Sequence, residues 1–180
     1  MTRYVAFLRG MNLGNRRLPM SRLKSLFEAL KFAEVETFIA SGNVLFSAQA
    51  GNMSGLESRI AEHLEAKLGY PVDTFVRTAA AVAAIGRAQC FAEEGRAGST
   101  VHVGFLQTEL PPEVARKLTA IRTPTAKFVV RGREYFWLCH GRTSDSQVWT
   151  FPELRALRLP TSTMRNMTSI RKLLAKHVAS

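Results

Sequence analysis

The sequence predicts an α+β protein made of two α/β units that pack together. Residues 1–77 alternate short apolar runs with segments of helical spacing, in the order β-α-β-β-α-β. This is the ferredoxin-like, or α/β plait, order. A similar but less regular alternation begins again near residue 100. We therefore expect a first unit with a trailing helix over residues 1–90, a linker over residues 91–99 and a second unit over residues 100–180.

The strands of the first unit are short apolar runs bounded by turn residues. They are expected at residues 3–9, 35–40, 44–47 and 72–77. Two helices connect them, each with a row of apolar residues at helical spacing. The first follows Pro19, a favoured first helical residue, and the second stops at Gly69.

Both faces of the first strand are apolar, because Tyr4, Ala6 and Leu8 alternate with Val5 and Phe7. Helices can cover only one face of the sheet. We therefore expect the second unit to lie against the other face.

The second unit has weaker signals. A trailing helix capped by Thr78 precedes the linker. The expected elements then are a strand at residues 100–106, a helix from Pro111 to about Ala120, a hairpin over residues 127–139, a short helix near residues 152–157 and a terminal helix that carries Ile170, Leu173, Leu174 and Val178. A polar run, residues 161–163, precedes the terminal helix.

The composition is that of a globular protein with a strong positive charge. Of the 180 residues, 46% are hydrophobic, and the formal net charge is +11. Such a charge favours acidic partners through long-range attraction. The sequence shows no signal-peptide pattern and no apolar run of the roughly 18 residues that a membrane span requires. With two cysteines, a reducing cytoplasm is the expected location.

The first candidate site lies where the first strand ends. Arg9, Gly10 and Asn12 stand between a strand and a helix, where phosphate-cradling loops occur. The spacing matches no standard nucleotide loop. Guanidinium groups, short polar side chains and backbone N–H groups nevertheless suit an anion. We predict that these residues bind a ligand, with a structural turn and solvated arginines as the alternative.

A second polar turn is expected beside the first. In the ferredoxin-like order, the first and third strands are antiparallel neighbours, so the start of the third lies beside the end of the first. This arrangement places Ser41, Gly42 and Asn43 next to Arg9. These residues are also ordinary turn formers, which is the structural alternative.

Arg165 and Asn166 complete the predicted ligand site. They precede the terminal helix in a region without acidic residues. If the second unit folds against the first, Arg165 faces the same cleft as Arg9. Capping of the terminal helix is the structural alternative for Asn166.

No pattern in the sequence identifies a reaction. The four histidines lack metal-site spacing, and Cys139 and His140 are adjacent strand residues that point to opposite faces. We expect no metal and no cofactor, and a binding protein rather than an enzyme. Tyr135 and Trp137 share one strand face, where they either belong to the core or stack on bases.

Three anchors of the sequence resemble a bacterial family. They are Phe7-Leu8-Arg9-Gly10-Met11-Asn12-Leu13-Gly14, Ser41-Gly42-Asn43-Val44 and Thr163-Met164-Arg165-Asn166-Met167. They are similar to the family called domain of unknown function 1697, and the resemblance runs over nearly the whole chain. It implies a two-part fold of plait-like units in a bacterial cytoplasmic protein, and no established activity. The chain departs from the family pattern at Met167, where Trp is usual, and at Asn15, where a second glycine is frequent.

These observations favour one function and leave two alternatives open. We expect a bacterial cytoplasmic protein that binds an anionic or phosphate-bearing ligand in a cleft between its two units. The alternatives are a nucleic-acid-binding protein that uses the basic C-terminal segment, and an enzyme that acts on a phosphorylated metabolite. The sequence predicts no membrane partner and leaves the ligand and the oligomeric state open.

Overall fold

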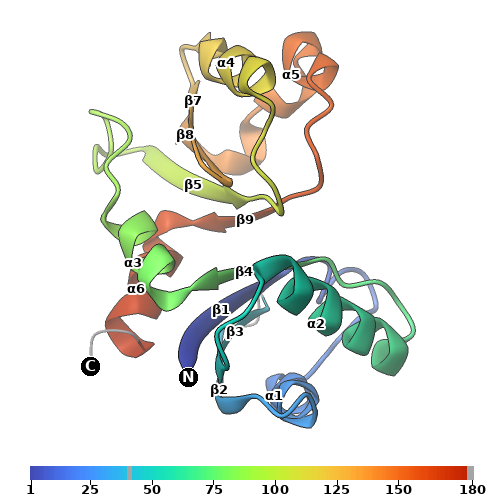
Figure 1. Cartoon of the computed structure of the whole chain (residues 1–180). Helices are drawn as coiled ribbons and strands as arrows, with labels where there is room; N and C mark the ends of the chain where they lie inside the picture. Colours follow the sequence, from blue (N-terminus) through green and yellow to red (C-terminus); the bar gives the residue numbers. More distant parts are fainter. Residues whose placement is uncertain (40–41, 178–180) are drawn as a thin grey trace. The chain divides into compact units, whose positions relative to one another are not determined.

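The chain folds into two compact units, each with an antiparallel sheet and its own helices (Figure 1). The computed structural model describes residues 1–39 and 42–177. One unit covers Met1–Ile85 and the other begins at Gly86, inside the helix α3 (Ala79–Arg87). The predicted α+β class is therefore confirmed.

The first unit is a four-stranded sheet with two helices on one face. Its strands lie in the order β2-β3-β1-β4, and every neighbouring pair is antiparallel. The strands are β1 (Thr2–Leu8), β2 (Ala33–Phe38), β3 (Asn43–Ala48) and β4 (Thr74–Thr78). The helices are α1 (Met20–Ala29), which follows β1, and α2 (Met53–Leu68), which follows β3. This element order agrees with the one predicted from the sequence.

The core of the first unit lies between these helices and one face of the sheet. Tyr4 and Ala6 of β1 are buried there together with Phe46 of β3. Phe27 of α1 and Ile60 of α2 are buried in the same cluster. Figure 1 shows both helices on the same side of the sheet. The alternation of side chains along β1 thus directs every second residue toward the helices.

Local signals mark both ends of α2. Asn52 caps the helix, because its Oδ1 accepts a hydrogen bond from the N–H of Ser54 at 3.1 Å. Gly69 adopts a left-handed conformation with φ of 79°, and its N–H donates to the carbonyl of Glu65 at 2.8 Å. The stop predicted at Gly69 is therefore confirmed.

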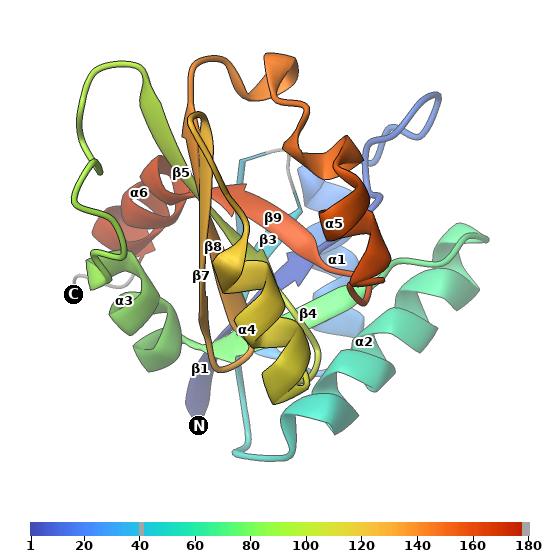
Figure 2. The same ribbon diagram turned by 90° about the horizontal axis from the view of Figure 1, so that it is seen from above.

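The second unit is a five-stranded antiparallel sheet in the order β6-β7-β8-β5-β9 (Figure 2). Its strands are β5 (Ser99–Phe105), β6 (Arg122–Thr123), β7 (Ala126–Arg131), β8 (Glu134–His140) and β9 (Thr163–Asn166). Its α-helices after α3 are α4 (Pro112–Ala120), α5 (Pro152–Ala156) and α6 (Met167–His177), and single 3₁₀ turns occupy Thr143–Asp145 and Val148–Thr150.

The core of the second unit contains Tyr135 and Trp137, the two aromatic residues considered for stacking on bases. Tyr135 and Trp137 are each 2% exposed, and the ring of Trp149 packs edge-on against Trp137 with centroids 5.3 Å apart. Leu118 of α4 and Leu154 of α5 complete the same cluster. A base cannot reach rings that are buried in this way, so the stacking role is wrong and these residues belong to the core.

β9 was not predicted. Residues 161–163 form a polar run in the sequence, from which we predicted no strand, whereas the structure pairs β9 with β5, with Arg165 opposite Val103. Hydrophobic periodicity misses such a strand because its buried side chains, Thr163 and Arg165, are polar. Val178, which we assigned to the apolar face of the terminal helix, lies outside the described residues.

Candidate functional site

Arg9 directly follows β1 and contacts Asp73, the residue that directly precedes β4. Its backbone N–H donates to the carbonyl of Asp73 at 2.9 Å, and its Nη1 lies 3.3 Å from Oδ2 of the Asp73 carboxylate. Both side chains are about half exposed, at 54% and 48%. The guanidinium is thus anchored at one nitrogen and open to solvent elsewhere.

The turn before β3 lies beside this strand end, as the predicted topology requires. Leu8 donates its backbone N–H to the carbonyl of Gly42 at 2.9 Å, and Phe7 is paired with Asn43. Gly42 has φ of +78°, and a Cβ there would lie 3.0 Å from Cγ of Met11 and 3.1 Å from Cβ of Leu8. Both the conformation and the close approach therefore require glycine at this position.

The two asparagines of the predicted site make local structural bonds. Asn43 is 2% exposed, and its Nδ2 donates to the carbonyl of Phe38 at 3.1 Å, which ties the end of β2 to the start of β3. The side chain of Asn12 accepts a hydrogen bond from the N–H of Leu18 at 3.2 Å. Asn12 therefore closes the loop that leads into α1, and Asn12 is itself exposed.

The loop between β1 and α1 is exposed and basic. Gly10 has φ of +80°, which lets the chain turn away from the sheet. Arg16 places its guanidinium over the ring of Tyr70, 4.1 Å from the centroid, and Arg17 is exposed. The first turn of α1 contains no acidic residue and no side-chain cap. Positive charge therefore gathers where the N–H groups of α1 begin.

Arg165 and Asn166 belong to the second unit. Arg165 is 8% exposed, and its Nη1 donates to Oγ1 of Thr163 at 2.7 Å and to the carbonyl of Met164 at 3.0 Å. Burial lowers the pKa of Arg165 to about 10. Asn166 accepts a hydrogen bond from the N–H of Thr168 at 2.8 Å, so that it caps α6, which is the structural alternative raised for it.

The structure therefore brings five of the predicted residues together in the first unit. We call them the strand-end surface: Arg9, Gly10, Asn12, Gly42 and Asn43. Ser41 lies outside the described residues. Arg165 and Asn166 lie in the other unit, and their convergence with Arg9 stays a prediction.

A family model described as a protein of unknown function, DUF1697, matches residues 1–136. The chain belongs to this family. The match includes the whole first unit, with the strand-end surface, and the second unit as far as β8.

The fold of this family member is similar to that of a solved structure. It is a conserved bacterial protein from Streptococcus pneumoniae, with 20% sequence identity and a TM-score of 0.75. The match covers 97% of this chain and 99% of that one. A comparison with curated proteins found no match. The likeness therefore supports the fold and carries no activity.

Sequence reasoning missed Asp73. The signal was present, because β4 also runs antiparallel to β1, with Leu8 opposite Thr74. The residue before β4 must therefore lie beside the residue after β1. The topology that placed Asn43 near Arg9 would have placed Asp73 there as well.

Cys139 and His140 are the reactive side chains that the sequence singled out in the second unit. Cys139 is buried, and burial raises the pKa of its thiol, which keeps it protonated. Nδ1 of His140 lies 2.8 Å from Oγ of Ser99. Across the described residues, no three His, Cys, Asp or Glu side chains gather as a metal site would require.

No helix within residues 1–39 and 42–177 is long and apolar enough to cross a membrane.

Proposed function

We propose that the protein binds a small anionic or phosphate-bearing ligand at the strand-end surface. The observation that supports this proposal is the exposed guanidinium of Arg9, fixed at the end of β1 beside a basic loop. Arg16 and Arg17 of that loop are exposed, and the acid that pairs with Arg9 is Asp73. Arginine suits this role because its planar fork matches phosphate and carboxylate oxygens.

The ion pair between Arg9 and Asp73 does not exclude an anion. The pair makes one contact of 3.3 Å, and both side chains are about half exposed. Exposed ion pairs of this kind contribute about 0–1 kcal/mol. A ligand with two or more charged oxygens can therefore compete with Asp73, or can use the guanidinium nitrogens that face solvent.

The test is a thermal-shift and calorimetric screen of inorganic phosphate, pyrophosphate, nucleotides and sugar phosphates. Arg9→Gln and Arg17→Gln should each lose most of the stabilisation that the best anion gives to the parent. Asp73→Asn should bind that anion more tightly, because it removes the competing carboxylate. Arg155→Gln is the control, since it removes an exposed arginine of the second unit.

Two results would overturn the proposal. One is a parent protein that no anion stabilises. The other is an Arg9→Gln protein that responds as the parent does, which would reduce the effect to general charge screening.

The two alternative functions have less support. Burial of Tyr135 and Trp137 leaves the nucleic-acid hypothesis with only the basic C-terminal segment. The enzyme hypothesis has the carboxylate of Asp73 beside Arg9, but that carboxylate already pairs with Arg9. Neither alternative has an observation that favours it over anion binding.

We also infer that the two units are α/β plaits of one kind. The strand order β7-β8-β5-β9 repeats the order β2-β3-β1-β4 when the strands are numbered within each unit. The helices α4 and α5 follow the first and third of these strands, as α1 and α2 do. β6 is then an addition at the edge of the second sheet.

A further inference from the structure

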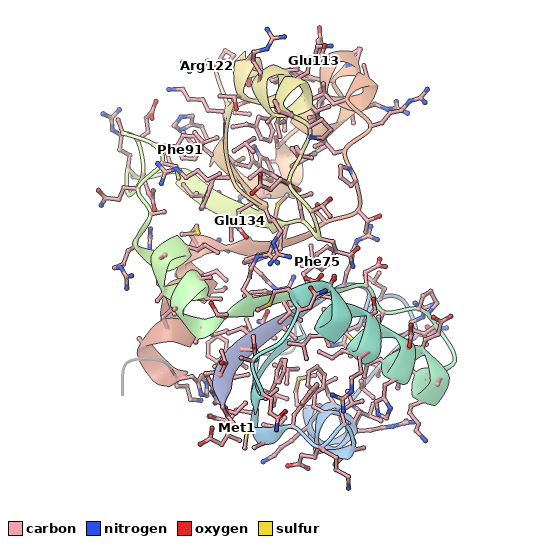
Figure 3. The ribbon with its side chains drawn as sticks, viewed as in Figure 1. Met1, Phe75, Phe91, Glu113, Arg122 and Glu134 are labelled. Atoms are coloured by element: carbon pink, nitrogen blue, oxygen red, sulfur yellow. The ribbon has the colours of Figure 1, made fainter. Side chains whose placement is uncertain are left out.

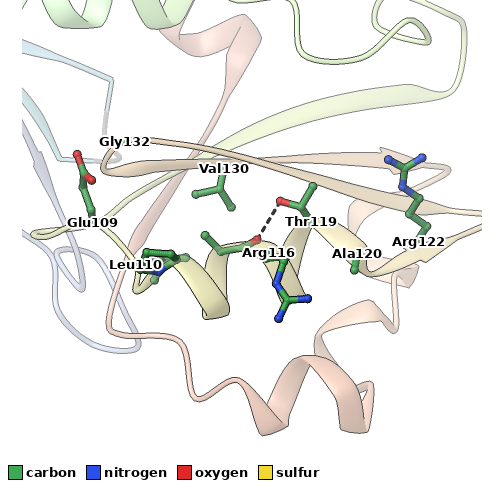
Figure 4. Close-up of a pocket in the computed structure, with 10 residues that line it drawn as sticks. Glu109, Leu110, Arg116, Thr119, Ala120, Arg122, Val130 and Gly132 are labelled. Carbon is green, nitrogen blue, oxygen red and sulfur yellow. Dashed lines mark hydrogen bonds between the residues drawn. The ribbon is translucent and has the colours of Figure 1, made fainter.

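The second unit contains an open groove that the strand-end surface does not involve. It has a volume of about 600 Å³ and runs between α4 and β7 (Figure 4). Its apolar lining includes Leu110, Ala115 and Val130, and its polar lining includes Arg116, Arg122 and Glu109. We call it the α4–β7 groove.

An unpaired strand edge borders this groove. β6 pairs with β7 only at Ala126 and Lys127, and the sheet ends at β6 in the part of the chain that the structure describes. The outer edge of β7 from Phe128 to Arg131 therefore has no neighbouring strand there. Backbone groups on such an edge are a template for another extended segment.

The charges at the groove favour an acidic occupant. Arg116 and Arg122 are exposed, and neither makes an ion pair among the described residues. The neighbouring acid of α4, Glu113, already pairs with Lys117 at 2.8 Å. Figure 3 labels Glu113, on α4, and Arg122, just after this helix.

The groove also has distinguishable ends. Figure 4 shows Glu109 and Gly132 at one end and Arg122 at the other. Oε1 of Glu109 lies 3.9 Å from the position that a Cβ of Gly132 would take. An acidic side chain therefore fits the Arg122 end better than the Glu109 end.

We propose that the α4–β7 groove binds an extended acidic peptide segment of a partner protein, which adds to the open edge of β7 as a strand. An apolar trough between a helix and an open strand edge suits this mode of recognition. Main-chain hydrogen bonds to β7 supply affinity. Alternate side chains enter the groove, where Arg116 and Arg122 select acidic residues.

The test uses the full chain and a displayed library of random peptides. Selected peptides should combine β-branched and acidic residues, and a synthetic copy of the best one becomes the probe. Ala120→Trp should abolish binding, because Ala120 is exposed and lines the groove, so that the larger side chain fills it. Ala156→Trp is the matched control, an exposed alanine on α5.

Two further measurements separate strand addition from charge attraction. Arg122→Glu should weaken the affinity for the acidic probe roughly tenfold or more. A probe with lysine in place of its acidic residues should recover binding to this variant. Amide exchange in β7 should slow when the probe binds. A probe with N-methyl groups on alternate residues should fail to bind, because it cannot complete the hydrogen-bond ladder.

Three outcomes would overturn the proposal. The library could yield no peptide whose binding Ala120→Trp removes, or β7 amide exchange could stay unchanged on binding. The parent could also dimerise while Ala120→Trp stays monomeric, which would show that a second copy of the chain occupies the edge of β7.

Discussion

Gly104 shows how a missing side chain shapes the second core. A Cβ at this position would lie 2.1 Å from Cζ of Tyr135, whose ring is buried and whose hydroxyl lies 2.8 Å from Oγ of Ser162. The ring cannot move away without breaking this contact or disturbing its neighbours. The ring of Tyr135 therefore packs directly against the backbone of β5 at Gly104.

We expect Gly104→Ala to lower the free energy of unfolding by about 1–3 kcal/mol, because it overpacks the core. Gly55→Ala should instead raise it by about 0.5–1 kcal/mol, since a Cβ there meets no atom within 4 Å and Gly55 lies inside α2. Urea unfolding of both variants, followed by circular dichroism, measures the two changes. Equal changes of one sign would contradict this account.

His102 makes the second unit sensitive to acid. Its ring packs on Trp137 with centroids 5.2 Å apart, and its Nδ1 is buried without a hydrogen-bond partner among the described residues. Burial lowers the pKa of His102 below its ordinary value of 6.5. The folded protein therefore holds the neutral imidazole more strongly than the unfolded chain does.

Stability should consequently fall as the pH drops below about 6.5, because the unfolded chain then binds a proton that the folded chain resists. The loss should continue until the pH passes the lower pKa of the folded state. Chemical unfolding at several pH values between about 5 and 7.5 tests this, in a range above the titration of most carboxylates. His102→Gln should flatten the profile, and an unchanged slope would disprove the role of this histidine.

At the scale of elements, a buried ion pair joins α2 to β4. Oε1 of Glu57 accepts a hydrogen bond from the N–H of Val76 at 2.8 Å and lies 3.6 Å from Nη1 of Arg77. The side chains of Glu57 and Arg77 are 3% and 4% exposed. Neither charge is easily reached by water, and the Nη1 of Arg77 also donates to the carbonyl of Val76 at 2.8 Å.

Glu57→Gln should destabilise the protein by about 3–5 kcal/mol, because it removes the negative charge beside the buried guanidinium of Arg77. The variant keeps an amide oxygen for the N–H of Val76, so the loss reports the charge. Glu62→Gln, at an exposed position of the same helix, should change stability by about 0.5 kcal/mol or less. Thermal unfolding compares the two, and a similar small effect of both would refute the importance of the pair.

Elements with a clear apolar period were predictable, whereas β9, whose buried side chains are polar, was not. The helix α2 follows from its apolar row and from Gly69, both visible in the sequence. β9 does not, because Thr163 and Arg165 are its buried side chains. Their burial depends on the pairing of β9 with β5, which no local pattern reveals.

At the scale of the whole molecule, the net charge of +11 predicts loose attraction to nucleic acids. We expect the affinity for duplex DNA and RNA, measured by filter binding, to fall by on the order of a thousandfold between about 50 and 200 mM salt. Counterion release drives this kind of binding. Binding of a small phosphate ligand should fall by about tenfold or less over the same range. A duplex affinity that persists at the higher salt, with sequence preference, would favour the nucleic-acid alternative.

Composition and apolar spacing were enough to predict the α+β class, most helices and the meeting of the first strand end with the turn before β3. These properties depend on local periodicity and on a strand order that leaves few arrangements. Tertiary packing decided that Tyr135 and Trp137 are buried, that Arg165 is buried, and that β9 pairs with β5. Such contacts join residues that are distant or unpatterned along the chain, so they form only when complete elements pack against one another.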